Sequence, residues 1–485
     1  MTRFAVIGGG MAGILSAIKL QEAGFTDFSV YEKSDALGGT WRENTYPGVA
    51  CDVPSHLYSY SFAPNPEWSH LFSPGQEIRA YFEEVAQRHG VPGFVRFGEE
   101  VTRLEHRQDG HGVGRWHLKT SAGTRDVADV VIAATGVLHH PRYPDIDGLD
   151  SFAGASFHSA RWDHSVDLEG ARVGVIGTGS SAVQIVSALA GAVGELRLFQ
   201  RTPQWVLKVE NPPIDEVDKE RYREDPSAMV TLHEDLSRSF SDNFANAVVD
   251  SESVGVKILA ELCKINLDSV VDPELREKLR PSYRAACKRL VISPDFYEAM
   301  QHPATHLVTE KILVIEPAGI RTVDGAMHEL DVLVLATGFR VDRFLRPMEV
   351  IGRGGVSLED VWAKRPSAYH SISVPDFPNL FMLNGPNGPV GNFSLIEVAE
   401  LQLAYIMQLV DQITAGPYRE ISARARALDV FERERVEAAA KTIWASGCNS
   451  WYLDDDGIPS AWPWTFDRFR EVMASPDLSC YELVG

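Results

Sequence analysis

The hydrophobic positions of the chain fall into short apolar runs that end in glycine, each followed by a stretch with apolar residues at helical spacing. Residues 3–8 form the first run, and residues 11–23 form the first predicted helix. A second apolar run at 28–32 completes the pattern. Uninterrupted apolar runs indicate strands that are buried on both faces, as in parallel sheets with helical crossovers. The chain is therefore predicted to open with a β–α–β unit.

The same unit is predicted a second time, near the middle of the chain. Apolar runs at 172–176 and 195–200 flank a predicted helix at 181–190. Each half also contains a similar strand that ends in Ala-Thr-Gly, DVVIAATG at 129–136 and DVLVLATGF at 331–339. This repetition indicates a duplicated architecture and not a low-complexity sequence. We therefore expect an α/β protein with two domains of one design.

A glycine-rich turn follows the first strand of the first unit, with the pattern Gly8-x-Gly10-x-x-Gly13. Glycine allows the backbone to approach a pyrophosphate closely, and the N–H groups at the start of the next helix bind it. Glu32 stands at the end of the second predicted strand. A carboxylate there accepts hydrogen bonds from a ribose diol, so this unit is predicted to be a Rossmann-like dinucleotide-binding domain.

The second unit has a turn of the same design, GTGSSA. Its predicted phosphate-binding residues are Gly177, Gly179, Ser180 and Ser181. At the position equivalent to Glu32 the second unit has Arg201, followed by Thr202. A guanidinium at this place suits a 2′-phosphate, although a solvated surface arginine is the alternative interpretation. Because the charge at this position differs between the two units, we predict that they bind two different dinucleotides. The second would be NADPH, which passes hydride to a flavin bound by the first.

The remaining elements complete two Rossmann-like domains, one for FAD and one for NADP. Further helices are predicted at 77–89, 395–413 and 422–444, and a further strand at 377–383. The predicted domains are an FAD-binding domain at 1–145, a linker at 146–165, an NADP-binding domain at 166–375 with a helical insertion at about 211–290, and a return to the FAD domain with a C-terminal tail at 376–485.

Composition and charge limit the kinds of molecule that the protein is expected to bind. The chain has 485 residues, of which 44% are hydrophobic and 23% charged, as in an ordinary globular enzyme. Its formal net charge of −21 repels nucleic acid and anionic lipid, so we expect neither as a partner. The phosphates of NADPH must then be attracted by local basic groups.

The cysteines and the apolar runs indicate the cellular compartment in which the protein is expected to work. Five cysteines are present without a CxxC pair, so neither a disulfide framework nor a zinc site is expected, and no metal is predicted. The chain opens directly into a strand, without an apparent leader, and no apolar run approaches the length of a membrane span. We expect a reduced, cytoplasmic protein.

The loop at 38–52 and the histidine at 158 have open roles by composition alone. Gly39 and Trp41 lie in an aromatic, glycine-rich loop that has room to pass close to a flavin ring. Asp52 ends this loop, where a carboxylate that caps a turn is the more common structure. His158 lies in the predicted linker, where it is either a structural histidine or part of a hinge.

The adjacent cations Lys288 and Arg289 are similarly ambiguous. Two neighbouring positive charges repel each other unless an anion is close, but a basic pair on the surface is equally common. Spacing alone does not decide between the two.

Taken together, these segments resemble the type I Baeyer–Villiger monooxygenases. The long pattern F-x-G-x-x-x-H-x-x-x-W followed by Pro or Asp is met in full at 152–163, including His158 and Trp162. A second pattern, small-Gly-x-Trp-x-x-x-x-aromatic-Pro-small-x-x-x-Asp, is met at 38–52. Further segments are similar at 336–339, 377–387 and 449–452, so the resemblance covers nearly the whole chain.

The resemblance implies roles for residues that composition left open. Arg289 matches the family's catalytic arginine beside the flavin, and Asp52 matches the carboxylate that positions it. Lys288 joins Arg201 and Thr202 in the site for the 2′-phosphate of NADP.

Three further matches concern the linker and the tail. His158 matches a linker histidine whose role is conformational, and Trp162 belongs to the same pattern. Trp451 matches a tail residue that helps to close the site over the nicotinamide.

The resemblance also implies the reaction. NADPH reduces FAD, dioxygen adds to the flavin, and the resulting peroxyanion attacks a ketone to give an ester or a lactone. We expect Arg289, held by Asp52, to stabilise the negative charge, because a guanidinium stays protonated and does not discharge the peroxide.

Three alternatives remain at this point. A flavin monooxygenase that oxidises sulfur or nitrogen lacks the pattern around Trp162 and the pair of Asp52 and Arg289. A disulfide reductase needs a redox-active cysteine pair, and the chain has no CxxC. A non-catalytic flavoprotein would consume NADPH without regard to added substrate. The identity of the ketone and the oligomeric state are not readable from the sequence.

Overall fold

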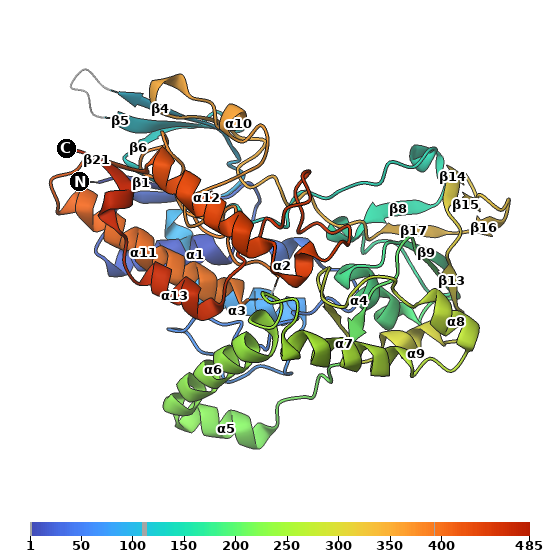
Figure 1. Ribbon diagram of the computed structural model, residues 1–485. Helices are drawn as coiled ribbons and strands as arrows, with labels where there is room; N and C mark the ends of the chain where they lie inside the picture. The colour runs from blue at the N-terminus through green and yellow to red at the C-terminus, as the bar shows by residue number, and fades with distance from the viewer. Residues whose placement is uncertain (1, 109–113, 392) are drawn as a thin grey trace.

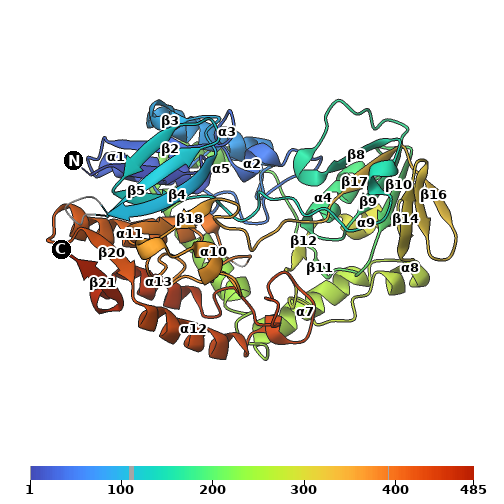
Figure 2. The same cartoon turned by 90° about the horizontal axis from the view of Figure 1, so that it is seen from above.

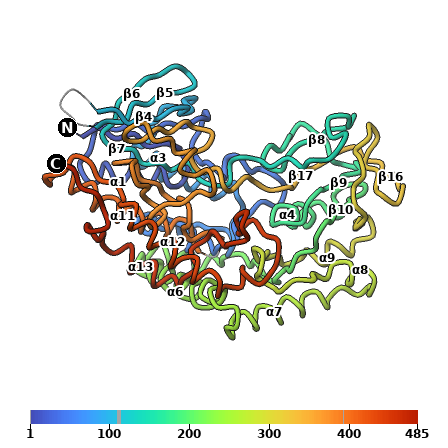
Figure 3. Tube along the Cα trace, turned by 45° about the horizontal axis from the view of Figure 1, so that its top comes forward, coloured from blue at the N-terminus to red at the C-terminus, as the bar shows by residue number. Residues whose placement is uncertain are grey.

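The computed structural model describes residues 2–108, 114–391 and 393–485, and it arranges them in two lobes (Figure 1, Figure 2). Each lobe is built on a five-stranded parallel sheet. The predicted α/β class and the duplication are therefore confirmed. The tube in Figure 3 shows that the chain passes from the first lobe to the second and returns, so that both termini lie on the first lobe.

The first lobe contains the sheet with the order β19-β7-β1-β2-β3. Its strands are β1 (Phe4–Ile7), β2 (Phe28–Tyr31), β3 (Val95–Arg96), β7 (Val130–Ala133) and β19 (Leu380–Met382). Every residue of β1, β2, β7 and β19 is buried, which explains their uninterrupted apolar runs. The helix after β1 packs against two others, and these three are α1 (Met11–Glu22), α3 (Gly75–Arg88) and α11 (Leu395–Thr414).

The second lobe contains the sheet with the order β13-β10-β9-β17-β8. Its strands are β8 (Ala155–His158), β9 (Arg172–Ile176), β10 (Glu195–Phe199), β13 (Thr305–Val308) and β17 (Val332–Leu335). The helix α4 (Ser180–Leu189), which follows β9, packs against α9 (Phe296–Met300). The order of β9, α4 and β10 repeats that of β1, α1 and β2 in the first lobe.

Smaller sheets complete both lobes and were not predicted. The sheet β18-β4-β5-β6 joins β4 (Val101–Gln108), β5 (Gly114–Thr120), β6 (Arg125–Ala128) and β18 (Glu349–Ile351), and the second lobe has an antiparallel sheet of β14 (Ile312–Glu316), β15 (Gly319–Thr322) and β16 (Met327–Glu329). Two short pairs are β11 (Val206–Leu207) with β12 (Val291–Ile292), and β20 (Glu420–Ala423) with β21 (Tyr481–Val484). The longest of these strands, β4 and β5, alternate buried and more exposed positions and mix charged with apolar residues, so they lack the apolar runs that indicate central strands.

The insertion between β11 and β12 is helical, as predicted. Its helices are α5 (Glu216–Glu224), α6 (Pro226–Phe240), α7 (Val254–Leu267) and α8 (Pro273–Lys278). They run along the lower edge of the molecule in Figure 1 and connect the two lobes. The other helices are α2 (Thr40–Glu43), α10 (Leu358–Val361), α12 (Ala425–Ala439) and α13 (Phe466–Ala474).

The pairing of strands places two segments differently from the predicted domains. Residues 155–158 of the predicted linker form β8, which is an edge strand of the second sheet. Residues 349–351 form β18, which pairs with β4 of the first lobe. The chain thus returns to the first lobe before residue 376. Neither strand has a strong sequence signal, since β8 contains a histidine and β18 is only three residues long.

The structure corrects the prediction about disulfides. Cys287 and Cys448 form a disulfide, with their Cα atoms 6.2 Å apart, while Cys51, Cys263 and Cys480 are free. The prediction was wrong because the two partners are separated by 161 positions, and spacing reveals only local pairs. Among the described residues, no helix is both long and apolar enough to cross a membrane.

Candidate active site

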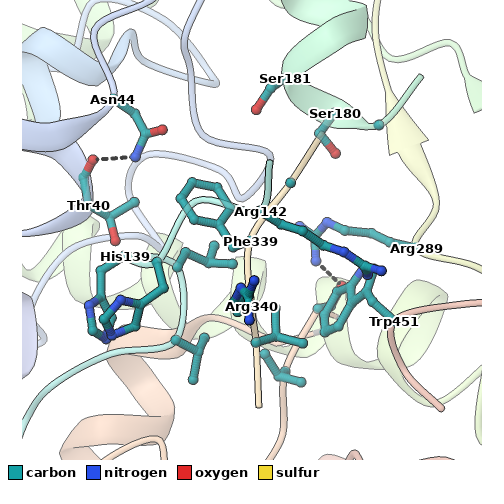
Figure 4. Close-up of a pocket in the computed structure, with 18 of the residues that line it drawn as sticks. Thr40, Asn44, His139, Arg142, Ser180, Ser181, Arg289, Phe339, Arg340 and Trp451 are labelled. Atoms are coloured by element: carbon teal, nitrogen blue, oxygen red, sulfur yellow. Dashed lines mark hydrogen bonds between the residues drawn. The ribbon is translucent and has the colours of Figure 1, made fainter. Parts of the chain in front are cut away.

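One large cavity of about 2690 Å³ is lined by residues of both lobes. Both glycine-rich turns contribute to its wall, as do the loop at 38–52 and the C-terminal tail. It lies at the carboxyl ends of β1 and β9, which is where ligands bind in parallel α/β sheets. Figure 4 shows part of this cavity, with residues of α2 on one side and Ser180 and Ser181 of α4 on the other.

The first glycine-rich turn is shaped for close approach of a ligand. Gly8 has φ of +105°, and a Cβ atom there would lie 2.5 Å from the carbonyl oxygen of Ala134. Gly10 caps α1 without a side chain, which leaves the N–H groups of the first helical turn open to an anion. Gly13 packs against the carbonyl of Gly8, so that helix and turn are in contact.

Glu32 stands beside this turn at the end of β2, where the sequence predicted a ribose site. Its carboxylate is buried and accepts hydrogen bonds from the N–H groups of Gly9, at 2.6 Å, and Ser34, at 2.9 Å. These bonds fix the carboxylate at the edge of the cavity, which it lines. Carboxylate oxygens have further lone pairs that can accept hydrogen bonds from two hydroxyl groups.

The loop at 38–52 passes directly over the first turn. Gly39 has φ of +53°, and a Cβ atom there would lie 2.9 Å from the Cα atom of Gly10. A side chain at either position would fill the space between the loop and the turn. The ring nitrogen of Trp41 donates to the hydroxyl of Tyr58 at 3.2 Å, which fixes the indole on the wall of the cavity.

The second glycine-rich turn repeats these features. Gly177 has φ of +124°, and a Cβ atom there would collide with the carbonyl of Ala336. Gly179 caps α4 without a side chain, as Gly10 caps α1. Ser180 and Ser181 form the first turn of α4, and the hydroxyl of Ser181 donates to the Tyr46 hydroxyl at 3.2 Å. The same open helix start is therefore present in both lobes.

Arg201 and Lys288 come together beside the second turn. Both line the cavity, and among the described residues neither forms an ion pair with a carboxylate. Burial, and then the charge of Arg201, lower the pKa of Lys288 below its usual value. Thr202 lies in the same segment, and its carbonyl accepts a hydrogen bond from Thr178 at 2.7 Å. Two neighbouring cations without a carboxylate partner could hold an anion.

Arg289 and Asp52 form an ion pair across the two lobes. Nη2 of Arg289 donates to Oδ2 of Asp52, and Nη1 donates to the carbonyl oxygen of Gly391 at 2.8 Å. Burial opposes the positive charge, but the attraction of Asp52 outweighs it and holds the pKa of Arg289 above its usual value. The arginine is therefore a permanent cation on the wall of the cavity.

The C-terminal tail covers this pair. Trp451 lies on the wall of the cavity on the same side as Arg289 (Figure 4), and its ring packs on that of Tyr452 with centroids 4.2 Å apart. Trp451 is 39% exposed, whereas Tyr452 is 2% exposed. The disulfide at Cys448 lies three residues before Trp451, so the tail is attached to the segment that carries Arg289.

His158 and Trp162 stand apart from the ion pair, at the junction of the two lobes. Nε2 of His158 lies 3.1 Å from the carbonyl oxygen of Gly338, and Nδ1 accepts from the N–H of Ala160 at 3.1 Å. Burial lowers the pKa of this histidine to about 4. The ring of Trp162 packs on Phe157 with centroids 4.9 Å apart. Neither residue lines the large cavity.

Three residues at or behind the wall of the cavity were not predicted from the sequence: Arg142 and Arg340, which line it, and Tyr452, which does not. Arg142 and Arg340 follow the two Ala-Thr-Gly turns, and Figure 4 shows both side chains in the cavity. Each lies in the segment that leaves the carboxyl end of a parallel strand, β7 or β17, and this was the available signal. Tyr452 belongs to the segment NSWY, but no role was inferred for it. No group of three or more metal-binding side chains is found within 2–108, 114–391 and 393–485.

The chain is similar to known monooxygenases along nearly its whole length. The sequence profile of the family described as "Flavin-binding monooxygenase-like" matches residues 1–346. A Baeyer-Villiger monooxygenase of Streptomyces coelicolor is 39% identical over 99% of this chain and 92% of its own length. An uncharacterized monooxygenase of Mycobacterium tuberculosis is 46% identical over 99% of this chain and 95% of its own length.

Solved structures of monooxygenases also match the whole chain. The cyclohexanone monooxygenase of Rhodococcus sp. Phi1 bound to NADP⁺ matches with a TM-score of 0.89 and 29% identity, covering 100% of this chain and 99% of that one. A steroid monooxygenase bound to NADP matches with a TM-score of 0.87 and 28% identity, with the same coverage of both chains.

Proposed function

The chain belongs to the flavin-binding monooxygenase-like family, and from this premise we propose how its residues carry out the reaction. It is a Baeyer–Villiger monooxygenase that uses FAD and NADPH. The reaction consumes a ketone, dioxygen, NADPH and a proton, and it yields an ester or lactone, water and NADP⁺. The observation that carries the assignment to this site is the ion pair of Arg289 and Asp52 in a cavity that both glycine-rich turns line.

FAD is proposed to bind the first lobe. Gly8, Gly10 and Gly13 form the pyrophosphate site at the start of α1, and Glu32 binds the adenosine ribose. Because Gly10 and Gly39 lack side chains, the loop at 38–52 can lie directly against the turn, and both line the cavity in which FAD would bind. When bound and reduced, FAD supplies the activation of dioxygen.

NADPH is proposed to bind the second lobe. Its pyrophosphate would lie at the start of α4, where Gly177, Gly179, Ser180 and Ser181 form the turn. Arg201 and Lys288, with Thr202, would bind the 2′-phosphate. The phosphate would relieve the mutual repulsion of the two cations, so its binding gains from both charges.

Arg289 is proposed to stabilise the negative charge that develops during oxygen transfer. Asp52 and Gly391 fix two of its nitrogens, so little reorganisation is needed when charge appears beside it. A permanently protonated guanidinium gives up no proton, and it therefore preserves an anionic reactant. Trp451 would exclude water above this site, which limits loss of oxygen as hydrogen peroxide.

His158 and Trp162 are proposed to act on conformation and not on chemistry. His158 lies outside the cavity and joins β8 to the turn after β17 through the carbonyl of Gly338. Its ring also packs against Tyr143 and Phe339, in the two segments by which the chain crosses between the lobes, so it is suited to fix that crossing. The proposed domains remain an FAD-binding first lobe and an NADP-binding second lobe.

The substrate is proposed to be an apolar or aromatic ketone. The lining of the cavity includes the apolar and aromatic residues Phe240, Phe244, Val390, Phe393 and Trp444. We also propose a cytoplasmic location, because the reaction depends on a pool in which NADPH is regenerated.

A panel of ketones and thioethers tests this function. The purified holoenzyme is supplied with NADPH, and products are identified by mass spectrometry. We expect ketones of apolar character to gain one oxygen atom as esters or lactones. Oxidation of thioethers alone would instead favour a sulfur-oxidising enzyme, and NADPH consumption that is independent of every added substrate would favour a redox carrier.

A further inference from the structure

We propose that Tyr452 is a positioning residue for Arg289, and that its hydroxyl fixes the guanidinium in the orientation that oxygen transfer needs. The inference rests on the function proposed above. It concerns a residue of the tail and not the pair of Arg289 and Asp52 itself.

The contact is visible around Gly391. A Cβ atom at Gly391 would collide with the Tyr452 hydroxyl and would lie 3.0 Å from Nη1 of Arg289. The hydroxyl and the guanidinium therefore face the same small space, which glycine leaves open. Arg289 also opposes the effect of burial on the pKa of Tyr452, as expected for a cation against the phenol oxygen.

Packing fixes the tyrosine ring independently of this contact. Tyr452 is 2% exposed, and its ring packs on Trp444 and Trp451 with centroids 5.1 Å and 4.2 Å away. The disulfide of Cys287 and Cys448 joins the segment before Arg289 to the segment before Tyr452. The hydroxyl is therefore a fixed point beside the guanidinium.

The contact with Tyr452 adds a third restraint on the guanidinium of Arg289. Asp52 and Gly391 accept from Nη2 and Nη1, and the Tyr452 hydroxyl lies beside the same small space as Nη1. The tyrosine thereby further restricts movement of the guanidinium away from the position that Asp52 and Gly391 define. Stabilisation of a developing charge depends on donors that are fixed before the charge appears.

The simpler explanation is that Tyr452 only fills space in the core of the tail. Removal of the hydroxyl would then leave the electrostatics of the flavin site unchanged, because phenylalanine fills nearly the same volume. The two explanations therefore differ in the charge that the flavin experiences and not in the stability of the fold.

The test compares Tyr452→Phe with wild type, Arg289→Ala and the double variant, all as holoenzymes. Two quantities are measured, the midpoint potential of the bound flavin and the ratio of ester to hydrogen peroxide. A fixed cation near the flavin favours its reduced, anionic form, so the potential should fall in Tyr452→Phe, in the direction of Arg289→Ala. The ester-to-peroxide ratio should fall about tenfold, the scale of one lost hydrogen bond to a charged group.

A double-mutant cycle makes the test specific for the contact. In the Arg289→Ala background, Tyr452→Phe should leave the midpoint potential unchanged, because the partner is gone. Tyr405→Phe serves as the matched control, since it removes another buried hydroxyl, bonded to Tyr481 at 2.9 Å, outside the cavity. That variant should match wild type in both quantities.

Each outcome decides one question. A wild-type potential and ratio in Tyr452→Phe, with both altered in Arg289→Ala, would overturn the role of Tyr452 and leave the proposed function intact. A shift of potential by Tyr452→Phe that persists in the Arg289→Ala background would also overturn it. Wild-type behaviour of Arg289→Ala itself would instead contradict the proposed function.

Discussion

The guanidinium of Arg289, in the segment between α8 and β12, is paired with the carboxylate of Asp52, in the loop over the first glycine-rich turn. The two residues are 237 positions apart and belong to different lobes. A cation is thereby held at the boundary of the two nucleotide sites, where neither lobe alone would place it.

Arg289→Ala should impair ester formation but leave reduction of the flavin by NADPH intact. Reduction of the flavin by NADPH should persist, because the arginine is not part of the proposed nucleotide site. Ester formation should fall by about 100- to 1000-fold, the effect of removing one preorganised charge-stabilising group. Stopped-flow bleaching of the flavin measures its reduction, and product mass measures ester formation. A variant with normal ester yield would remove Arg289 from the mechanism.

Arg201→Ala should weaken NADPH binding about 10- to 100-fold, because a charged hydrogen-bond partner of the 2′-phosphate is lost. NADH lacks that phosphate, so its affinity should remain nearly unchanged. Titration of the holoenzyme with each nucleotide gives the two dissociation constants. Arg172→Ala, at an exposed ion pair with Asp331 in the same lobe, is the control. An equal loss for both nucleotides would show that Arg201 acts on the fold.

The disulfide predicts a thiol count. Under denaturing conditions without a reductant, three of the five cysteines should react with a thiol reagent, and all five after reduction. Cys448→Ser should lower the melting temperature, since the bridge limits the freedom of the unfolded chain over 161 residues. Cys480→Ser, which changes a free cysteine, should have little effect. Five reactive thiols in the untreated protein would rule out the bridge.

The histidine at the junction of the lobes predicts a loss of stability in acid. Burial lowers the pKa of His158 to about 4 from the usual 6.5, so the unfolded chain binds this proton more tightly. The contribution is complete above pH 6.5 and is lost as the pH falls towards 4. His158→Gln should flatten this part of the profile by up to about 3 kcal/mol. Unfolding midpoints between pH 4.5 and 7 measure it, and equal slopes in both proteins would contradict the prediction.

Much of the fold follows from the sequence because its central strands are buried on both faces. The apolar run at 172–176 corresponds to β9, and the run at 28–32 contains β2. The strands β4 and β18 were not predicted, because half-exposed strands carry charged residues and their pairing depends on distant segments. Local patterns thus define the two central sheets but not the parts added at their edges.

The same distinction between local patterns and distant contacts applies to the residues of the candidate site. The glycine turns and the charges of Glu32 and Arg201 could be read from spacing, because their chemistry is local to a β–α–β unit. The pairing of Arg289 with Asp52 came only from family resemblance, and the contact with Tyr452 came only from the structure. Contacts between segments hundreds of residues apart leave no local trace in one sequence.

The bridge from Cys287 to Cys448 gives the tail two attachments. After Cys448 the chain continues into α13 and β21 of the first lobe. The disulfide joins Cys448 to Cys287, in the segment before β12 of the second lobe. Residues 449–465 are consequently held at both ends, and several of them line the cavity. One stretch of the cavity wall is thus covalently tied to both lobes, and reduction of the bridge would leave it covalently attached to the first lobe alone.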